Sequence, residues 1–165
     1  MFYQIKKMAP YILVAIFFVV IDRFLKSLAI LKQEKVNLIG DLFSFNFSEN
    51  YNIAFSLPVG GLILVGLIIL IILILIYFLI NLVKKNQHYL AGLLFVLIIG
   101  AASNLLDRFK YGYVVDYLDL KYFTVFNIAD VMIVCSVGVL IYINFMKDKR
   151  GREDNRHKED ESKIG

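Results

Sequence analysis

The sequence contains an uncharged apolar run, Leu57–Val83, whose core reads GLILVGLIILIILILIYFLINLV. A helix needs about 20 consecutive apolar residues to cross the hydrocarbon core of a bilayer, so this run is long enough to span one. The composition agrees, because 59% of the 165 residues are hydrophobic, whereas soluble domains are closer to half apolar. The run therefore predicts a helical membrane protein.

Three further segments are predicted to be membrane helices. Tyr89–Leu106 is a second uncharged run, and Val131–Met146 reaches spanning length only if Asn127–Asp130 join it. The first segment, Pro10–Ile30, is apolar as far as Ile21 and then reads DRFLK. No small-residue cleavage site follows it, so we interpret it as a retained anchor. The predicted fold class is an all-α polytopic membrane protein with four transmembrane helices.

Lysine and arginine residues predict the orientation of these helices. They cluster before the first helix, between the second and third, and after the fourth, at Lys6–Lys7, Lys84–Lys85 and Lys147–Arg152. The three clusters share one side if the helices alternate, and the positive-inside rule makes that side cytoplasmic. Both termini are then cytoplasmic, and the longer loops, about 31–56 and 107–126, lie outside.

The charged C-terminal region is expected to differ from the rest of the chain. Residues 1–147 form a single four-helix membrane domain in this prediction, whereas residues 148–165 mix acidic and basic side chains with almost no apolar ones. Such a segment cannot bury a core, so we predict a disordered tail. The net charge of +4 is explained by topology and by anionic lipid, so no nucleic-acid partner is expected.

Cysteine and histidine usage excludes several kinds of chemistry. Cys135 is the only cysteine, which excludes an internal disulfide, and we interpret it as a small packing residue of the last helix. His88 lies in the predicted link between the second and third helices and His157 in the charged tail, so neither is close in sequence to the aspartates of the outer half. A zinc site and a Ser-His-Asp triad are therefore not expected, and no metal or cofactor is predicted.

Two aspartates of the outer half are candidates for catalysis. Asp130, in FNIAD, stands in the first turn of the last helix. It could favour the helix dipole or mark the water boundary, but an ionisable group inside the membrane edge is more often functional. Asp116 has apolar, β-branched neighbours, which we interpret as an amphipathic segment on the bilayer surface. A solvated loop residue is the alternative for Asp116.

A pair of carboxyl groups has a chemistry that neither group has alone. In a site of low dielectric constant two neighbouring carboxyls cannot both ionise easily, so one pKa rises and the pair titrates as a coupled unit. One member can then accept a proton from water while the other protonates the departing group. Sequence spacing leaves open whether Asp116 and Asp130 meet.

Asp22 and Lys26 are four residues apart, so they share one face of the first helix. We interpret them as an ion pair at the helix end, with Lys26 reaching toward the lipid headgroups. Such a surface pair predicts only a modest effect of substitution. Asp119, in YLDLKY, is predicted to face water.

Four motifs, in order along the chain, resemble those of the bacterial lipoprotein signal peptidase family, also called signal peptidase II. They are DRFLK at Asp22–Lys26, NYNIAFS at Asn50–Ser56, GAASNLLDRFKYGYVVDYLDL at Gly100–Leu120 and FNIAD at Phe126–Asp130. The last two are long and specific. The resemblance covers about residues 8–147 and leaves out the tail.

The resemblance implies an aspartic endopeptidase that cleaves a diacylglyceryl-modified prolipoprotein just before its lipidated cysteine. It implies a place in the bacterial inner membrane, in contact with lipid, with the active site near the extracytoplasmic surface. We predict a monomer. Asp116 and Asp130 match the catalytic aspartates of the family. Positions that match the family's substrate-binding or supporting residues are Asn50, Asn104, Asp107, Arg108, Asn127, Asp22 and Lys26. Arg108 could pair with Asp107 or hold the substrate backbone or headgroup.

The resemblance also implies a small extracytoplasmic β-sheet and a short surface amphipathic helix over the site. The sequence agrees with the sheet, since LFSFNF within residues 37–56 alternates with period two. Three residues depart from the family pattern, because Asn52 and Ser103 stand in place of glycine and Ile53 in place of alanine. Asn52 is expected to keep a turn, since asparagine tolerates the left-handed conformation.

Two functions of other classes remain open at the level of sequence. A small proton- or ion-coupled carrier would bind its ion at Asp130 and Asp22, but no carboxyl lies near the middle of a predicted helix. A non-catalytic membrane assembly factor would tolerate the loss of either aspartate. A serine–lysine protease using Lys26 with Ser27 or Ser103 leaves the two aspartate motifs unexplained.

Overall fold

The protein is described here by a computed structural model covering residues 2–51 and 61–164, with side chains placed for residues 6–51, 61–150 and 152. The described chain forms four long helices and one antiparallel sheet of four strands. The helices are α1 (Phe2–Lys32), α2 (Gly61–Lys84), α3 (His88–Tyr111) and α4 (Ile128–Ile164). The strands are β1 (Val36–Ile39), β2 (Phe43–Asn50), β3 (Val114–Leu120) and β4 (Val125–Phe126).

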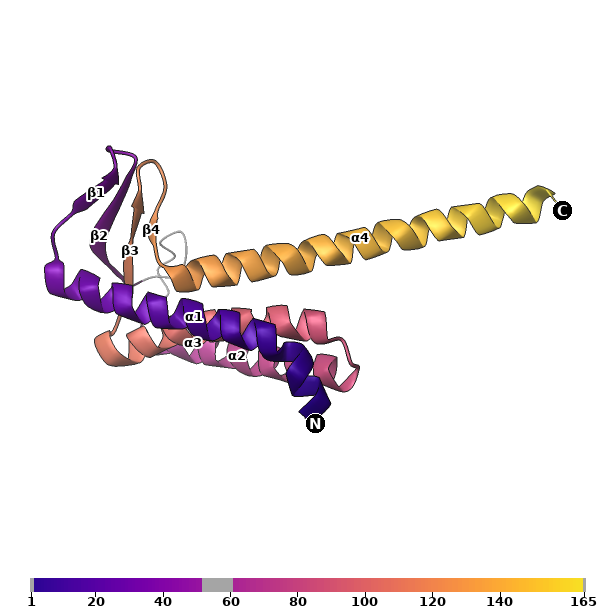
Figure 1. Cartoon of the computed structure of the whole chain (residues 1–165), viewed down its shortest axis with the longest axis horizontal. Coiled ribbons are helices and arrows are strands. Elements are labelled where there is room, and N and C mark those ends of the chain that lie inside the picture. The colour runs from indigo at the N-terminus through magenta and orange to yellow at the C-terminus, as the bar shows by residue number, and fades with distance from the viewer. Residues whose placement is uncertain (1, 52–60, 165) are drawn as a thin grey trace.

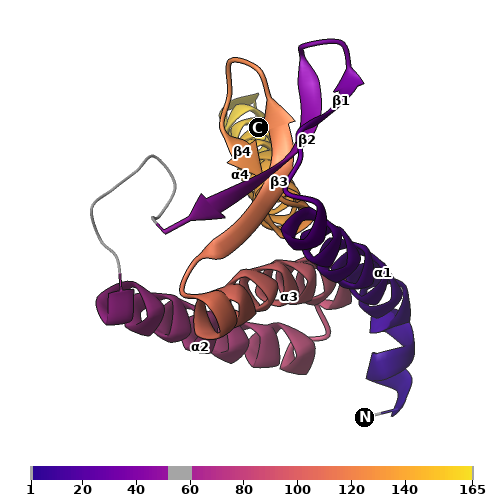
Figure 2. The same ribbon diagram turned by 90° about the vertical axis from the view of Figure 1, so that its left-hand side faces the viewer.

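Helix α3 lies at the centre of the bundle, between α1, α2 and α4 (Figures 1 and 2). One side packs on α2 and α4 through a cluster built on Leu94, Leu97 and Ile98. Another side packs on α1 and α4 through Val96, which contacts the cluster of Ala15 and Met132. Half of the most apolar stretch of α3 is buried, whereas only 6% of that of α2 is buried. Helix α3 therefore packs against the other helices, and α2 forms part of the outer surface.

The apolar helices confirm the prediction of a helical membrane protein with a small sheet. Among the described residues, three helical segments are long and apolar enough to cross a membrane: α2, α3 and residues Ile128–Arg150 of α4. Leu62 and Ile63 of α2 are 90% and 76% exposed, a pattern that suits contact with lipid and not with water. The fourth predicted span, in α1, stays a prediction.

The sheet lies at one end of the bundle, beside the end of α1 and the start of α4 (Figure 1). Its strand order is β1-β2-β3-β4, with every neighbouring pair antiparallel. Gly112 turns the chain from α3 into β3: it has φ 82° and its N–H donates to the Arg108 carbonyl. A glycine adopts this left-handed conformation readily. Asp116 is thereby placed four residues beyond the turn.

The prediction of an amphipathic surface segment around Asp116 is wrong, because this segment is strand β3. Val114 and Val115 are β-branched, which favours a strand, and β3 pairs with β2 in a register that sets Asp116 opposite Ser48. The short surface helix is not among the described helices. Asn52 and Ile53 lie outside the described residues.

Helix α4 differs from its prediction in two respects. It continues to Ile164, where we expected disorder from residue 148. Lysine, arginine and glutamate are good helix formers, and Asp148 pairs with Arg152 one turn later at 2.9 Å. Cys135 is exposed on α4, so it is not the packing residue that we expected.

The close approach of α3 to α4 depends on Gly100, and this yields a prediction. A Cβ at Gly100 would lie 2.9 Å from the Ala129 carbonyl oxygen and 3.2 Å from Met132. We expect Gly100→Ala to lower the free energy of unfolding by about 1–3 kcal/mol, because overpacking forces two backbones apart. Gly138→Ala is the matched control, since a Cβ there meets nothing within 4 Å.

Thermal unfolding in detergent micelles measures both changes. Gly138→Ala should be neutral or slightly stabilising, because alanine favours a helix over glycine. Equal melting temperatures for the two variants would contradict this packing of α3 against α4.

Candidate active site

The first turn of α4 is closed by a reciprocal pair of hydrogen bonds that follows from the sequence NIAD. The Asn127 side-chain oxygen accepts from the Asp130 N–H at 2.9 Å, and the Asp130 carboxylate accepts from the Asn127 N–H at 3.1 Å. This is a capping box, in which the residue before the helix and the third residue of the helix satisfy each other's backbone. The predicted position of Asp130 in the first helical turn is confirmed.

Asn127 also connects Asp130 to Asp116. Its amide nitrogen donates to Asp116 Oδ1 at 2.6 Å, while Asn50 from β2 donates to Asp116 Oδ2 at 2.9 Å. Asn127 and Asp116 are 0% and 1% exposed, whereas Asp130 is partly exposed. Strand β3 and helix α4 therefore bring the two predicted aspartates to one place, with one asparagine bonded to both.

The surroundings of Asp116 favour its neutral form. Burial raises the pKa of Asp116 most, and the nearby charge of Asp130 raises it further, to about 7. Hydrogen bonds from Asn50 and Asn127 and the charge of Lys26 act in the opposite direction. A carboxyl group with a pKa near neutrality can hold or release a proton at the pH of a cell.

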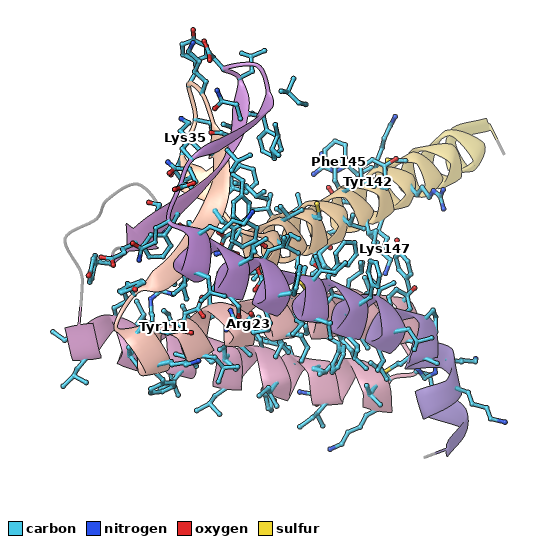
Figure 3. The ribbon with its side chains drawn as sticks, turned by 60° about the vertical axis from the view of Figure 1, so that its left-hand side comes forward. Arg23, Lys35, Tyr111, Tyr142, Phe145 and Lys147 are labelled. Carbon is cyan, nitrogen blue, oxygen red and sulfur yellow. The ribbon has the colours of Figure 1, made fainter. Side chains whose placement is uncertain are left out.

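Beneath the carboxyl pair lies a buried ion cluster that joins α1 to α3. Lys26 Nζ lies 2.7 Å from Asp107 and 3.1 Å from Asp22, and Arg23 Nη1 lies 2.7 Å from Asp107. Asp22 and Asp107 are fully buried, and Lys26 is 2% exposed. Arg23 lies between the ribbons of α1 and α3 (Figure 3). The four formal charges cancel, which is the condition under which such groups can be buried.

Asn104 links the ion cluster to the carboxyl pair. Its oxygen accepts from Lys26 Nζ at 2.8 Å, and its amide nitrogen donates to Asp130 Oδ1 at 2.7 Å. An unbroken set of hydrogen bonds therefore runs from Lys26 through Asn104 to Asp130, and from there through Asn127 to Asp116. The orientation of Asp130 is thus fixed from α3 as well as from its own helix.

The interpretation of Asp22 and Lys26 as a surface pair is wrong. The ion pair itself is present, but both side chains are buried instead of reaching the headgroups, because Asp107 of α3 draws Lys26 inward. Of the two roles considered for Arg108, pairing with Asp107 is taken by Arg23 and Lys26. Arg108 lies in the electrostatic field of Asp130, Asp116 and Asp107.

Sequence reasoning missed the parts played by Arg23 and Tyr117. The Tyr117 hydroxyl donates to Asp22 at 3.0 Å and accepts the Ile128 N–H at 3.2 Å, so it connects β3, α1 and α4. The sequence DRFLK did contain a signal for Arg23. It places two cations, Arg23 and Lys26, beside the single anion Asp22, and burying both cations needs a second anion, which is Asp107. Tyr117 gave no signal, since a tyrosine in a strand most often only packs.

The hydrogen bonds of Ser103 and Lys26 do not fit the serine–lysine protease considered from the sequence. The Ser103 hydroxyl, 2% exposed, donates to Asp22 at 2.8 Å. Lys26 donates to two carboxylates and to Asn104, so it is a structural cation and not a base. The Ser27 hydroxyl donates to the Arg23 carbonyl one helical turn earlier, and the groups within reach of Lys26 Nζ are Asp22, Asp107 and Asn104.

Asp119 takes part in a separate group on the sheet. Its carboxylate accepts hydrogen bonds from Lys35, Ser44 and Asn46 at 3.0–3.2 Å, and its side chain is 20% exposed. The hydrogen bond from Lys35 is the largest influence on Asp119 and lowers its pKa. Asp119 is therefore only partly open to water, and its hydrogen bonds within the described residues go to this group and not to Asp116 or Asp130.

Known proteins resemble this chain along most of its length. The family model described as signal peptidase (SPase) II matches residues 14–146. The lipoprotein signal peptidase of Clostridium tetani is 34% identical over 155 residues, 88% of this chain and 97% of its own. That of Brevibacillus brevis is 33% identical over 156 residues, 86% and 99% respectively. A solved bacterial membrane enzyme aligns with a TM-score of 0.72 at 25% identity, covering 86% of this chain and 90% of that chain.

The apolar helices and the gathered carboxyl groups fit a membrane-bound protease of the aspartic type. The match to the family model covers well over half of the residues, and the relatives exceed 30% identity. The chain belongs to the signal peptidase II family. Membership in a family of peptidases does not favour the carrier or the assembly factor.

The ion cluster yields a prediction that differs from the one based on a surface pair. Asp22→Asn removes one of two negative charges and leaves Arg23 and Lys26 with Asp107 alone. We expect the free energy of unfolding to fall by about 3 kcal/mol, the lower end of the range for breaking a buried pair, because an amide still accepts some of the hydrogen bonds. Chemical or thermal unfolding in micelles measures this loss.

Two further variants test whether the loss of stability comes from the unbalanced charge of the ion cluster. Arg23→Gln added to Asp22→Asn restores a neutral cluster and should recover part of the stability. Asp41→Asn is the exposed control, since Asp41 lies 4.0 Å from Lys121 and is 80% exposed; it should change little. An equal loss in Asp22→Asn and Asp41→Asn would show that the cluster contributes nothing.

Proposed function

We propose that this protein removes the signal peptide from lipoprotein precursors, with Asp116 and Asp130 as the reacting pair. The observation that carries the proposal is that Asn127 makes hydrogen bonds to both aspartates. Its side-chain amide donates to Asp116, and its backbone N–H donates to Asp130. Family membership supplies the reaction class. By its resemblance to the family, the bond that is cut is the one just before the lipidated cysteine of the precursor.

The two carboxyls have surroundings that suit different roles. Asp116 is fully buried with a pKa of about 7, so it holds the proton and acts as the acid. Asp130 is the more exposed member and accepts hydrogen bonds at both oxygens from Asn104 and the Asn127 N–H. Asp116 also accepts hydrogen bonds at both of its oxygens, so exposure distinguishes the two carboxyls. Water can reach Asp130, which therefore acts as the base.

The reaction follows from these roles. Asp130 takes a proton from water as the water oxygen bonds to the carbonyl carbon. Asp116 gives its proton to the departing nitrogen as the C–N bond breaks. The products are a signal peptide with a new carboxyl end and a lipoprotein with a free amino end. The proton has then moved from Asp116 to Asp130, and its return through the solvent prepares the next cycle.

The position of the site explains why a membrane protein performs this hydrolysis. Asp116 and Asp130 lie where β3 and the first turn of α4 meet, at the end of the bundle that carries the sheet (Figure 1). A lipidated substrate would keep its acyl chains beside the apolar helices and present the peptide bond at this end. We propose that the protein acts as a monomer without a metal ion.

Substitution of each aspartate tests the assignment. Asp116→Asn and Asp130→Asn should each lower kcat by about 10²–10⁴-fold, because an amide neither takes nor gives the proton. The double variant should be little worse than either single one, since residues that act as a unit are strongly non-additive. The measurement is cleavage of a diacylglyceryl-modified precursor peptide by purified, folded variants.

Asp119→Asn is the matched control for these variants. It lies on the same strand but bonds to Lys35, Ser44 and Asn46 instead, so turnover should stay near that of the parent. Normal turnover in Asp130→Asn, or loss only in Asp119→Asn, would contradict the assigned roles. A chelator should leave the activity unchanged.

We also propose four membrane spans, α1 included, with both termini in the cytoplasm and the sheet outside. The N-terminus and the α2–α3 link lie at the end of the bundle opposite the sheet (Figure 1). The basic pairs Lys6–Lys7 and Lys84–Lys85 belong to that end, as the positive-inside rule requires of a cytoplasmic side.

Reporter fusions test this topology. A reporter fused at the C-terminus should be active only if it works in the cytoplasm, and one inserted after Asp41, in the turn between β1 and β2, only if it works outside. Activity of an extracytoplasmic reporter at the C-terminus would contradict four spans.

A further inference from the structure

The far end of the sheet exposes large apolar side chains that the proposed reaction does not use. Two turns meet there, residues 39–42 between β1 and β2 and residues 121–124 between β3 and β4; we call them together the sheet tip. The Lys121 N–H donates to the Leu42 carbonyl at 2.9 Å, so the two turns form one surface. The exposed apolar residues of the tip are Ile39 (64%), Leu42 (58%), Tyr122 (91%) and Phe123 (71%).

Turn chemistry does not account for these residues. Tyr122 has φ 78°, a conformation that is unfavourable for a bulky side chain and that glycine or asparagine adopts more readily. Turns that face water usually carry small or polar residues. An exposed patch of large apolar side chains marks a surface that contacts something other than water.

The orientation of the sheet indicates what this surface contacts. The strands run across the helix axes and project sideways from the end of the bundle, in both views (Figures 1 and 2). Helices that cross a bilayer lie along its normal, so strands that cross them lie along its surface. The sheet tip is therefore held at the level of the membrane boundary and outside the bundle, where lipid is the neighbour.

We infer that the sheet tip inserts into the headgroup–acyl boundary of the outer leaflet, as a second membrane contact beside the spanning helices. Tyrosine is enriched at this boundary because one end of its side chain is apolar and the other polar. The charged groups at the tip are Lys121 and Asp41, 4.0 Å apart, and their formal charges cancel. The contact is thus apolar, and raised salt should not release it.

This contact gives the sheet two fixed ends. Its base is bonded to α1 and α4 through Tyr117, and its tip is held by lipid. Strand β3, which carries Asp116, runs between them. The inference does not depend on Asp116 and Asp130 being the reacting pair.

The absence of tryptophan from the sequence makes the inference directly measurable. Phe123→Trp introduces the only tryptophan of the sequence at the tip, and Tyr122→Trp is a second reporter in case the first variant fails to fold. Each is placed in phosphatidylcholine nanodiscs at one protein per disc, with acyl chains brominated near the headgroup, brominated near the chain end, or not brominated. Leu73→Trp, on the exposed face of α2, calibrates deep lipid contact, and Arg152→Trp calibrates water.

We expect blue-shifted emission from Phe123→Trp relative to Arg152→Trp, and a larger loss of emission with shallow than with deep bromination. Leu73→Trp should show the reverse order of quenching. Both signals should persist at high salt. Emission and quenching equal to those of Arg152→Trp, in both tip reporters, would overturn the inference. A blue shift that appears only with two proteins per disc, without quenching by bromine, would overturn it in favour of contact between copies.

Discussion

The buried carboxylate of Asp22 is the interaction on which most of the structure depends. It accepts hydrogen bonds from Ser103 of α3, from Tyr117 of β3 and from the Ala129 N–H of α4, and it pairs with Lys26 of its own helix. A carboxylate excluded from water is stable only if such partners surround it. The requirement to satisfy one charge therefore draws α1, α3, α4 and the sheet together at one end of the bundle.

Charge balance then determines where the carboxyl pair can lie. Arg23 and Lys26 neutralise Asp22 and Asp107. Within the described part of the chain, Asp116 and Asp130 lie beside this cluster without a salt bridge of their own. Their contacts to it pass through neutral amides of asparagine. An amide orients a carboxyl without holding it ionised as a bound cation would, and this leaves Asp116 free to carry a proton near neutral pH.

The sequence predicted the helices because a long apolar run with basic flanks has a direct structural consequence in a bilayer. The residues of the candidate site were predicted from four motifs. The sequence placed Asp130 correctly because a capping box is local. It misjudged Asp22 and Lys26, since burial of a helix end depends on Asp107, 81 residues away from Lys26 (107 − 26). The prediction of an amphipathic surface segment around Asp116 also failed, because pairing with β2 makes this segment a strand. Contacts between distant segments cannot be read from spacing within either one.

Titration of the Asp116 carboxyl tests the coupling of the pair most directly. Aspartate labelled with ¹³C at the side-chain carboxyl reports each group by NMR in micelles, and the Asp116→Asn variant assigns the signal. We predict an apparent pKa of about 7 for Asp116, which falls when Asp130→Asn removes the neighbouring negative charge. Titration of Asp116 near the ordinary value of about 4, unchanged by Asp130→Asn, would contradict a coupled carboxyl pair.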